Sequence, residues 1–223
     1  KLLIRDELAT RGIVVIDGAD LARIKRRQVP RIRRKIGIVF QDFKLLPRKT
    51  VWENVAFALE VTGTPGRQIR PAVDRVLALV GLLLLHAAVN ALNEASDMTS
   101  GIDLRTTRTP FSGGSGTLPA GLLSVRTTRV FAYACVLVAG VIGVYFASRL
   151  GAAFALLIGV GGVAVLFYSE VFARSGLGEL FAGLGLGALP VWGAAWVQGQ
   201  EPGAAVLWAG APAFFMTFNL LLL

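Results

Sequence analysis

A cluster of oxygen-bearing side chains lies within residues 90–103 of the 223-residue chain. Asn93 and Asp97 are four residues apart, so a continuous helix places them on one face, with Glu94 on a neighbouring line. Asp103 follows a short distance along the chain. Carboxylate and amide oxygens are hard ligands that suit Mg²⁺ bridged to phosphate oxygens. We call Asn93, Glu94, Asp97 and Asp103 the aspartate cluster. Their chemistry predicts a phosphate site, and an ordinary acidic loop is the alternative.

Basic residues follow directly after the aspartate cluster. Arg105 and Arg108 carry guanidinium groups that can contact phosphate oxygens as bidentate forks. Carboxylates and amides at a membrane interface are costly unless they bind something. The arginines strengthen the prediction of a phosphate ligand.

The elements that must position these residues are apolar. Four runs approach the roughly 20 residues that cross a bilayer, and a fifth run ends beside the aspartate cluster. Four such runs in succession, with short loops, favour membrane helices over a buried soluble core. The runs cover residues 130–147, 150–168, 177–197 and 204–223, and the fifth covers 76–92.

The net positive charge of the chain is confined to its first third. Up to residue 82 there are 17 Lys and Arg against 8 Asp and Glu, and from residue 83 onward there are 6 of each. This division excludes one uniform soluble domain, and the apolar composition excludes a disordered chain. A lone cysteine, Cys135, excludes a disulfide scaffold. The basic run at 23–35 has no interleaved aromatic residue, so we interpret it as a solvated face and expect no nucleic acid.

Charge placement also predicts an orientation. Four arginines lie between the first two runs, and Arg174 follows the run that ends at residue 168, whereas Arg149 is the one arginine on the opposite side. The positive-inside rule then places the aspartate cluster on the cytoplasmic side of the inner membrane. If the run at 76–92 spans the membrane, the basic segment before it falls on the disfavoured side. The side of residues 1–75 therefore stays open.

The first 82 residues have the pattern of a small α/β segment. The spacing predicts a short helix from Leu2 to Leu8, strands at 13–16 and 36–40, and a helix at 68–82. Thr50, with Glu53 three residues later, predicts a helix over 50–59 that begins with a capping box.

Two stretches of this segment resemble the Q-loop region of ABC transporter ATPases, particularly the cell-division type. They are Ile36 to Pro47, which contains Gln41, and Thr50 to Val55. The resemblance implies that Gln41 would reach the magnesium and attacking water of bound ATP, and that a membrane permease would be the partner. The sequence contains no G-x-x-x-x-G-K-[ST] phosphate loop, so ATP binding is the alternative function.

The remaining residues resemble the UbiA-type prenyltransferases, in particular the menaquinone-type branch. The resemblance rests on the pattern Asn93-Glu94-x-x-Asp97 with a later Gly101-x-Asp103, on a glycine-rich stretch at 109–116, and on Gly-Leu-Gly-Glu at 176–179. It implies transfer of a polyprenyl group from its diphosphate to an aromatic or quinone-precursor acceptor.

The resemblance also implies roles for individual residues. Asn93, Asp97 and Asp103 would hold Mg²⁺ on the diphosphate, and Arg108 would neutralise the leaving group, which makes Asp97 and Arg108 the expected catalytic residues. The second aspartate motif of the family is missing from the sequence. We therefore expect weak activity or none.

The sequence predicts a fusion of two incomplete pieces. Residues 1–82 are expected to form a partial ABC ATPase domain of the α/β class. Residues 83–223 are expected to form a mainly α, polytopic membrane bundle of about five spanning helices, truncated relative to the UbiA fold.

Overall fold

The structure is a computed structural model that describes residues 2–33, 35–36, 45–106, 114–200 and 203–220. Contacts divide the chain into two compact units, one ending at Ile69 and the other beginning at Arg70. Helix α3 (Gly66–Ser100) continues without a break through residues 82 and 83. Secondary structure therefore does not mark the predicted domain boundary, which stays a prediction.

The first unit contains a small antiparallel hairpin. Strands β1 (Val15–Ile16) and β2 (Ala19–Asp20) pair with Val15 opposite Asp20. Asp17 and Gly18 form the turn, and both have positive φ angles, of 51° and 73°. Positive φ at both central residues is the conformation that matches the twist of a two-residue hairpin, which explains the Asp-Gly sequence. The predicted strand is thus present in its last two residues, and the strand predicted at 36–40 lies almost wholly outside the described residues.

The prediction of a helix from Leu2 to Leu8 is wrong, because residues 2–5 form turns and residues 6 and 7 form bends. Leu3 and Leu8 have exposed side chains, so the apolar face of such a helix has nothing to pack against. Isolated helices this short are marginal in water. A short 3-10 turn, η1 (Arg26–Gln28), and helix α1 (Val29–Arg33) follow the hairpin.

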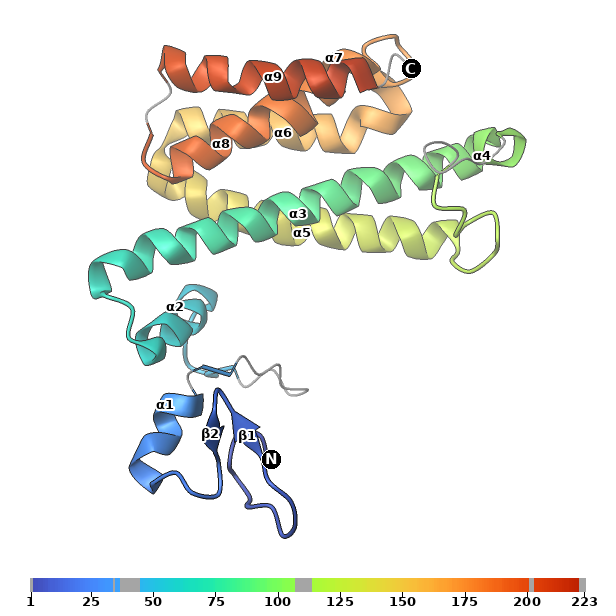
Figure 1. The fold of residues 1–223 in the computed structure, drawn as a ribbon. Helices are drawn as coiled ribbons and strands as arrows, with labels where there is room; N and C mark the ends of the chain where they lie inside the picture. The colour runs from blue at the N-terminus through green and yellow to red at the C-terminus, as the bar shows by residue number, and fades with distance from the viewer. Residues whose placement is uncertain (1, 34, 37–44, 107–113, 201–202, 221–223) are drawn as a thin grey trace. The chain divides into compact units, whose positions relative to one another are not determined.

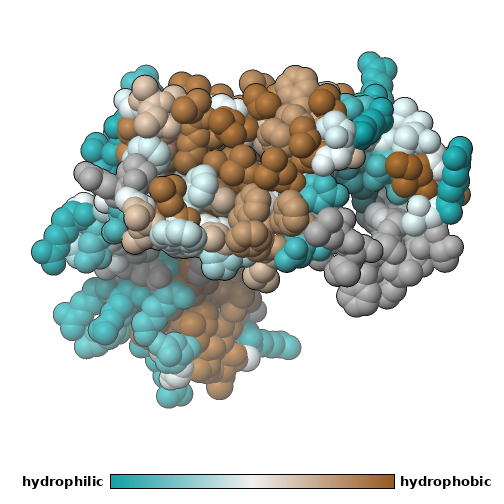
Figure 2. Space-filling view, turned by 90° about the horizontal axis from the view of Figure 1, so that it is seen from above, coloured by the Kyte–Doolittle hydropathy of each residue, from teal (hydrophilic) through white to brown (hydrophobic). Residues whose placement is uncertain are grey.

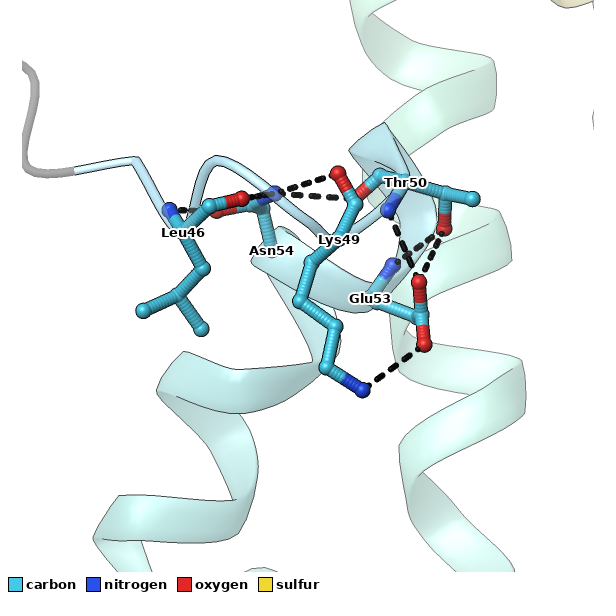
Figure 3. A network of polar contacts seen from close by, with 5 residues as sticks. All are labelled: Leu46, Lys49, Thr50, Glu53 and Asn54. Carbon is cyan, nitrogen blue, oxygen red and sulfur yellow. Dashed lines mark hydrogen bonds and ion pairs between the residues drawn. The ribbon is translucent and has the colours of Figure 1, made fainter.

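Helix α2 (Val51–Thr62) begins as the sequence predicted. The Thr50 hydroxyl accepts from the Glu53 amide at 3.2 Å, and the Glu53 carboxylate accepts from the Thr50 amide at 2.8 Å. Asn54 of α2 forms hydrogen bonds to the preceding loop. Its Oδ1 accepts from the Leu46 amide at 2.7 Å, and its Nδ2 donates to the Thr50 carbonyl (Figure 3). The capping box is confirmed.

The second unit is a bundle of helices. Helix α3 is followed by α4 (Ile102–Arg105), α5 (Val125–Leu150), α6 (Ala152–Phe167) and the π-helical turn η2 (Tyr168–Phe172). The chain continues through α7 (Gly178–Ala182), a second π-helical segment η3 (Gly183–Ala188), α8 (Leu189–Val197) and α9 (Ala204–Leu220). Figure 1 shows α3 and α5 side by side, with α6, α8 and α9 forming another layer.

Helices α3 and α5 pack antiparallel. The Asp74 carboxylate, near the start of α3, accepts from Arg149 at 2.8 Å and from the Tyr145 hydroxyl at 2.9 Å, near the end of α5. Arg129 donates to Thr99 at the other end of the pair. The Asp74 carboxylate is buried, so its hydrogen-bonded arginine offsets the cost of removing that charge from water.

Four helical segments are long and apolar enough to cross a membrane, judged by length and composition. They are 66–100, 125–150, 152–172 and 178–197, and α9 is a shorter apolar helix. Nearly all described residues of the five predicted apolar runs are therefore helical. Their outward side chains are apolar, as at Leu137 and Val144 on α5, each 70% exposed, and Figure 2 shows apolar residues gathered over one face of the bundle. The prediction of a mainly α membrane bundle is confirmed.

Glycines allow close packing between η3 and α9. A Cβ atom built on Gly187 would lie 2.5 Å from the Ala213 carbonyl oxygen, and one on Gly183 would lie 3.0 Å from atoms of Phe214. No side chain fits at the first position without a shift of backbone. Small residues at such crossings are how membrane helices approach closely.

Candidate functional site

The aspartate cluster lies at the end of α3 and the start of α4. Asn93 Nδ2 donates to Asp97 Oδ2 at 2.9 Å, which confirms that the four-residue spacing places the two side chains on one face. Asn93, Glu94, Asp97 and Asp103 are all half-buried. Gly101, with a φ of 79°, separates the two helices and redirects the chain before Asp103.

Glu94 holds the chain that follows the cluster. Its Oε1 accepts from the Ser115 amide at 2.7 Å, and its Oε2 accepts from the Ser115 hydroxyl at 3.0 Å. Gly114 lies between carboxylates, because a Cβ built on it would be 3.6 Å from oxygens of both Asp103 and Glu94. Its φ of 63° favours glycine there. Glu94 therefore anchors the chain at Ser115, a role that sequence reasoning missed.

A second segment, which consists of η2 and the residues after it, faces the aspartate cluster. The Ser169 hydroxyl donates to Asn93 Oδ1 at 3.2 Å, and Ser169 is buried. Arg174 donates to the buried Ser96 hydroxyl at 3.3 Å and pairs with Glu170 at 3.2 Å. Single π-helical turns occur frequently at functional sites, and this one presents Ser169 to α3.

Sequence reasoning missed Ser169 and Arg174 as members of this site. They lie 76 and 78 residues from their partners on α3, beyond any local spacing rule. The sequence did contain a signal for a functional site here, because polar Ser169 and Glu170 come directly at the end of an apolar run.

The electrostatic environment of Asp97 is mixed. The carboxylates of Asp103 and Glu94 and the guanidinium of Arg174 all act on its charge. The two carboxylates and the guanidinium therefore act on the charge of Asp97 in opposite directions.

The predicted site residues fall into two groups. Asn93, Asp97 and Asp103 come together at this end of the bundle. Arg108, predicted to contact diphosphate, and Gln41, the alternative nucleotide contact, lie outside the described residues. Residues 109–113 of the glycine-rich stretch lie outside them too.

The donor set suits magnesium in its chemistry. Asp97 Oδ2 accepts the Asn93 amide, whereas Asp97 Oδ1 accepts no hydrogen bond among the described residues. Within those residues, no three His, Cys, Asp or Glu side chains form a ready cage for a metal. Mg²⁺ is usually held by one or two carboxylates together with substrate phosphates. The arrangement therefore fits a magnesium ion that binds together with a diphosphate.

An apolar cavity of about 300 Å³ lies between α3, α5, α6, η3 and α8. Phe146 and Phe154 form part of its wall, and its few polar lining residues are Arg75, His86 and Gln198. Helix α3 lines it at Leu85 and His86, and Asn93 follows two turns farther along, about 10 Å by helix rise. Helix α3 thus carries part of the cavity wall together with Asn93, Glu94 and Asp97 of the aspartate cluster.

The sequence model of the UbiA prenyltransferase family matches residues 55–223, which contain both the aspartate cluster and the cavity. The chain belongs to the UbiA prenyltransferase family. This UbiA family match begins before the predicted boundary at residue 82 and includes all four long apolar helices. Membership makes the chain a multi-pass membrane protein of the prenyltransferase class.

The N-terminal end is similar to a different group of proteins. It is 55% identical over 82 residues to the cell division ATP-binding protein FtsE of Bacillus subtilis, which covers 37% of this chain and 36% of that protein. The FtsE protein of Streptococcus pneumoniae strain D39 is 49% identical over 80 residues, 36% of this chain and 35% of that protein. The methionine import ATP-binding protein MetN of Vibrio vulnificus strain YJ016 is 42% identical over 85 residues, 38% of this chain and 25% of that protein.

The chain spans about a third of the length of these FtsE relatives. No solved structure matches the chain. The prediction that one chain joins segments similar to two different families is confirmed.

Proposed function

We propose that the chain binds a polyprenyl diphosphate with Mg²⁺ at the aspartate cluster and transfers the prenyl group to an acceptor. The observation that carries the proposal is the convergence of Asn93, Asp97 and Asp103 at one end of the bundle. UbiA family membership supports the substrate class. Proteins usually hold Mg²⁺ by one or two carboxylates, and the phosphates of the substrate supply further oxygen ligands.

The residues have distinct roles in this proposal. Asp97 and Asp103 hold the metal, and Asn93 orients Asp97 and offers a further oxygen. A Mg²⁺ ion held there would supply positive charge that favours departure of the diphosphate from the allylic carbon. Arg108 stabilises the same leaving-group charge from the protein side. Asp97 and Arg108 are the proposed catalytic residues.

The cavity beside α3 suits the hydrocarbon tail. Its lining is apolar apart from three polar residues, and burial of each CH₂ group contributes roughly 0.8 kcal/mol. Helix α3 leads from this cavity to Asn93, so a tail in the cavity and a diphosphate at the cluster belong to one elongated ligand. An aromatic or quinone-precursor ring is the proposed acceptor, because an electron-rich ring attacks an allylic cation readily.

The proposal is tested by binding of geranyl diphosphate to the full chain in detergent. The wild type is expected to bind in the presence of Mg²⁺ and not with EDTA. Asp97→Ala should weaken binding at least about tenfold, the factor typical for a group in a metal's coordination shell or next to it. Glu60→Gln, an exposed carboxylate on α2, is the matched control and should bind like wild type. Equal binding by Asp97→Ala would contradict the proposal.

ATP binding with a membrane permease partner is the second candidate, favoured by the 55% identity to FtsE. In this case Gln41 would contact the nucleotide. We expect ATP to leave the thermal unfolding temperature unchanged, because the sequence has no phosphate loop to hold the triphosphate. A saturable, magnesium-dependent rise in that temperature would favour the ATP-binding alternative.

A further inference from the structure

Two hydrogen bonds run in sequence from η2 to the aspartate cluster. The Ser169 hydroxyl donates to Asn93 Oδ1 at 3.2 Å, and Asn93 Nδ2 donates to Asp97 Oδ2 at 2.9 Å. An asparagine amide has one oxygen that accepts and one nitrogen that donates. A donor on its oxygen therefore fixes which end of the amide faces the carboxylate.

The consequence reaches the second oxygen of Asp97. Because Oδ2 is held by the amide, the carboxylate has a defined rotation, and Oδ1 carries no hydrogen bond from the residues that the structure describes. A carboxylate that is already oriented and has one oxygen without a hydrogen bond can bind a cation without losing rotational freedom. A freely rotating one must lose that freedom when the ligand binds.

Burial holds Ser169 in place to orient the Asn93 amide. The serine is 8% exposed, and Tyr168 beside it packs against the hydrophobic core of the bundle. The π-helical turn therefore holds Ser169 on a packed part of the molecule. Arg174 makes a second link from this segment to α3 through Ser96, one turn from Asn93. The two links fix the segment against the helix that carries the cluster.

We propose that Ser169 is a positioning residue that orients the Asn93 amide, and through it the Asp97 carboxylate, for the magnesium diphosphate group. This inference rests on the proposed function for its ligand. Ser169 does not touch the reacting atoms and acts through Asn93. Residues of this kind that orient metal ligands typically change metal affinity about 10- to 100-fold when removed.

The hydrogen bond itself is tested without any ligand. The chain has four asparagines, at 54, 90, 93 and 219, so ¹⁵N-asparagine labelling of the full chain in detergent gives a simple set of side-chain amide signals. Ser169→Ala should shift the Asn93 pair, which Asn93→Gln identifies by its disappearance. Ser175→Ala is the control, because that hydroxyl donates to the Phe172 carbonyl of its own segment. An Asn93 pair identical in wild type and Ser169→Ala would overturn the proposal.

The effect on the ligand is tested by magnesium-dependent binding of geranyl diphosphate. Ser169→Ala should weaken binding about tenfold, and Ser169→Thr, which keeps the hydroxyl, should bind like the wild type. In an Asn93→Ala background, Ser169→Ala should have no further effect, since the two side chains act in series. Additive losses in the double variant would overturn the proposal. A wild-type chain that does not bind would contradict the proposed function, and the amide comparison would still decide whether Ser169 holds Asn93.

Discussion

Glu94 shows how the structure changes the interpretation of a single residue. Its position beside Asp97 suggested a member of a metal site, whereas both of its oxygens accept hydrogen bonds from Ser115, 21 residues along the chain. A carboxylate that accepts two hydrogen bonds is well satisfied without a cation. Asp97 and Asp103 remain the carboxylates proposed for the metal.

Glu94→Ala should therefore loosen the chain around Ser115. The Ser115 amide loses its acceptor, so its hydrogen exchange should become faster, as measured by exchange and mass spectrometry over residues 114–117. The exchange rate of the α5 core should not change. Glu60→Ala is the control for removal of a carboxylate elsewhere. Unchanged exchange at Ser115 would mean that Glu94 does not anchor this stretch.

At the scale of elements, helix starts and membrane helices could be predicted because their determinants are local. Thr50 and Glu53 are three residues apart, and each apolar run contains its own signal. Contacts between elements could not be predicted, since Ser169 meets Asn93 and Arg149 meets Asp74 across 76 and 75 residues. The helix expected from Leu2 to Leu8 has the right local spacing but is absent from the structure. Its apolar side chains have no other element to pack against.

The capping box of α2 predicts a pH dependence. The Thr50 backbone amide, followed by Lys49 and the Thr50 hydroxyl, lowers the pKa of Glu53 from 4.5 to about 2. A lowered folded-state pKa means that this stabilisation is complete above about pH 4.5 and is lost as the pH falls toward 2. Carbon-13 NMR of glutamate carboxyl groups should show one residue titrating near 2. That signal should be absent in Glu53→Gln, and a Glu53 that titrates near 4.5 would contradict the capping assignment.

The contact between η3 and α9 predicts the effect of single methyl groups. Gly187→Ala places a Cβ 2.5 Å from the Ala213 carbonyl oxygen, which only a backbone shift can relieve. We expect a destabilisation of about 1–3 kcal/mol, observed as a lower unfolding temperature in detergent. Gly162→Ala is the matched control, because nothing lies within 4 Å of its added Cβ. Equal unfolding temperatures for the two variants would mean that the helices do not pack this closely.

At the scale of the whole molecule, the chain combines a basic segment similar to ABC ATPases with a membrane bundle of the UbiA family. The net charge of +9 comes from the first 82 residues. Residues 83–223 carry no net charge, and their arginines are distributed unevenly between the two sides of the predicted membrane segments. That distribution underlies the proposal that the aspartate cluster faces the cytoplasm of a bacterial-type inner membrane.

Cysteine labelling tests this orientation. In a Cys135→Ala background, Ser175→Cys should react with a membrane-impermeant maleimide only from the cytoplasmic side, and Gln200→Cys only from the opposite side. Both positions are exposed and lie at opposite ends of the segment 178–197. Reaction of both from the same side would contradict a spanning segment between them. Reaction with the sides exchanged would contradict the cytoplasmic placement.

The central claim is that a divalent cation and a diphosphate bind together beside Asn93 and Asp97. Mn²⁺ prefers the same oxygen ligands as Mg²⁺, and it broadens NMR signals of nearby groups. With ¹⁵N-asparagine labelling, Mn²⁺ plus geranyl diphosphate should broaden the Asn93 side-chain amide in the wild type and in Glu60→Gln, but not in Asp97→Ala. An Asn93 signal that stays sharp in the wild type at saturating Mn²⁺ and geranyl diphosphate would contradict the claim.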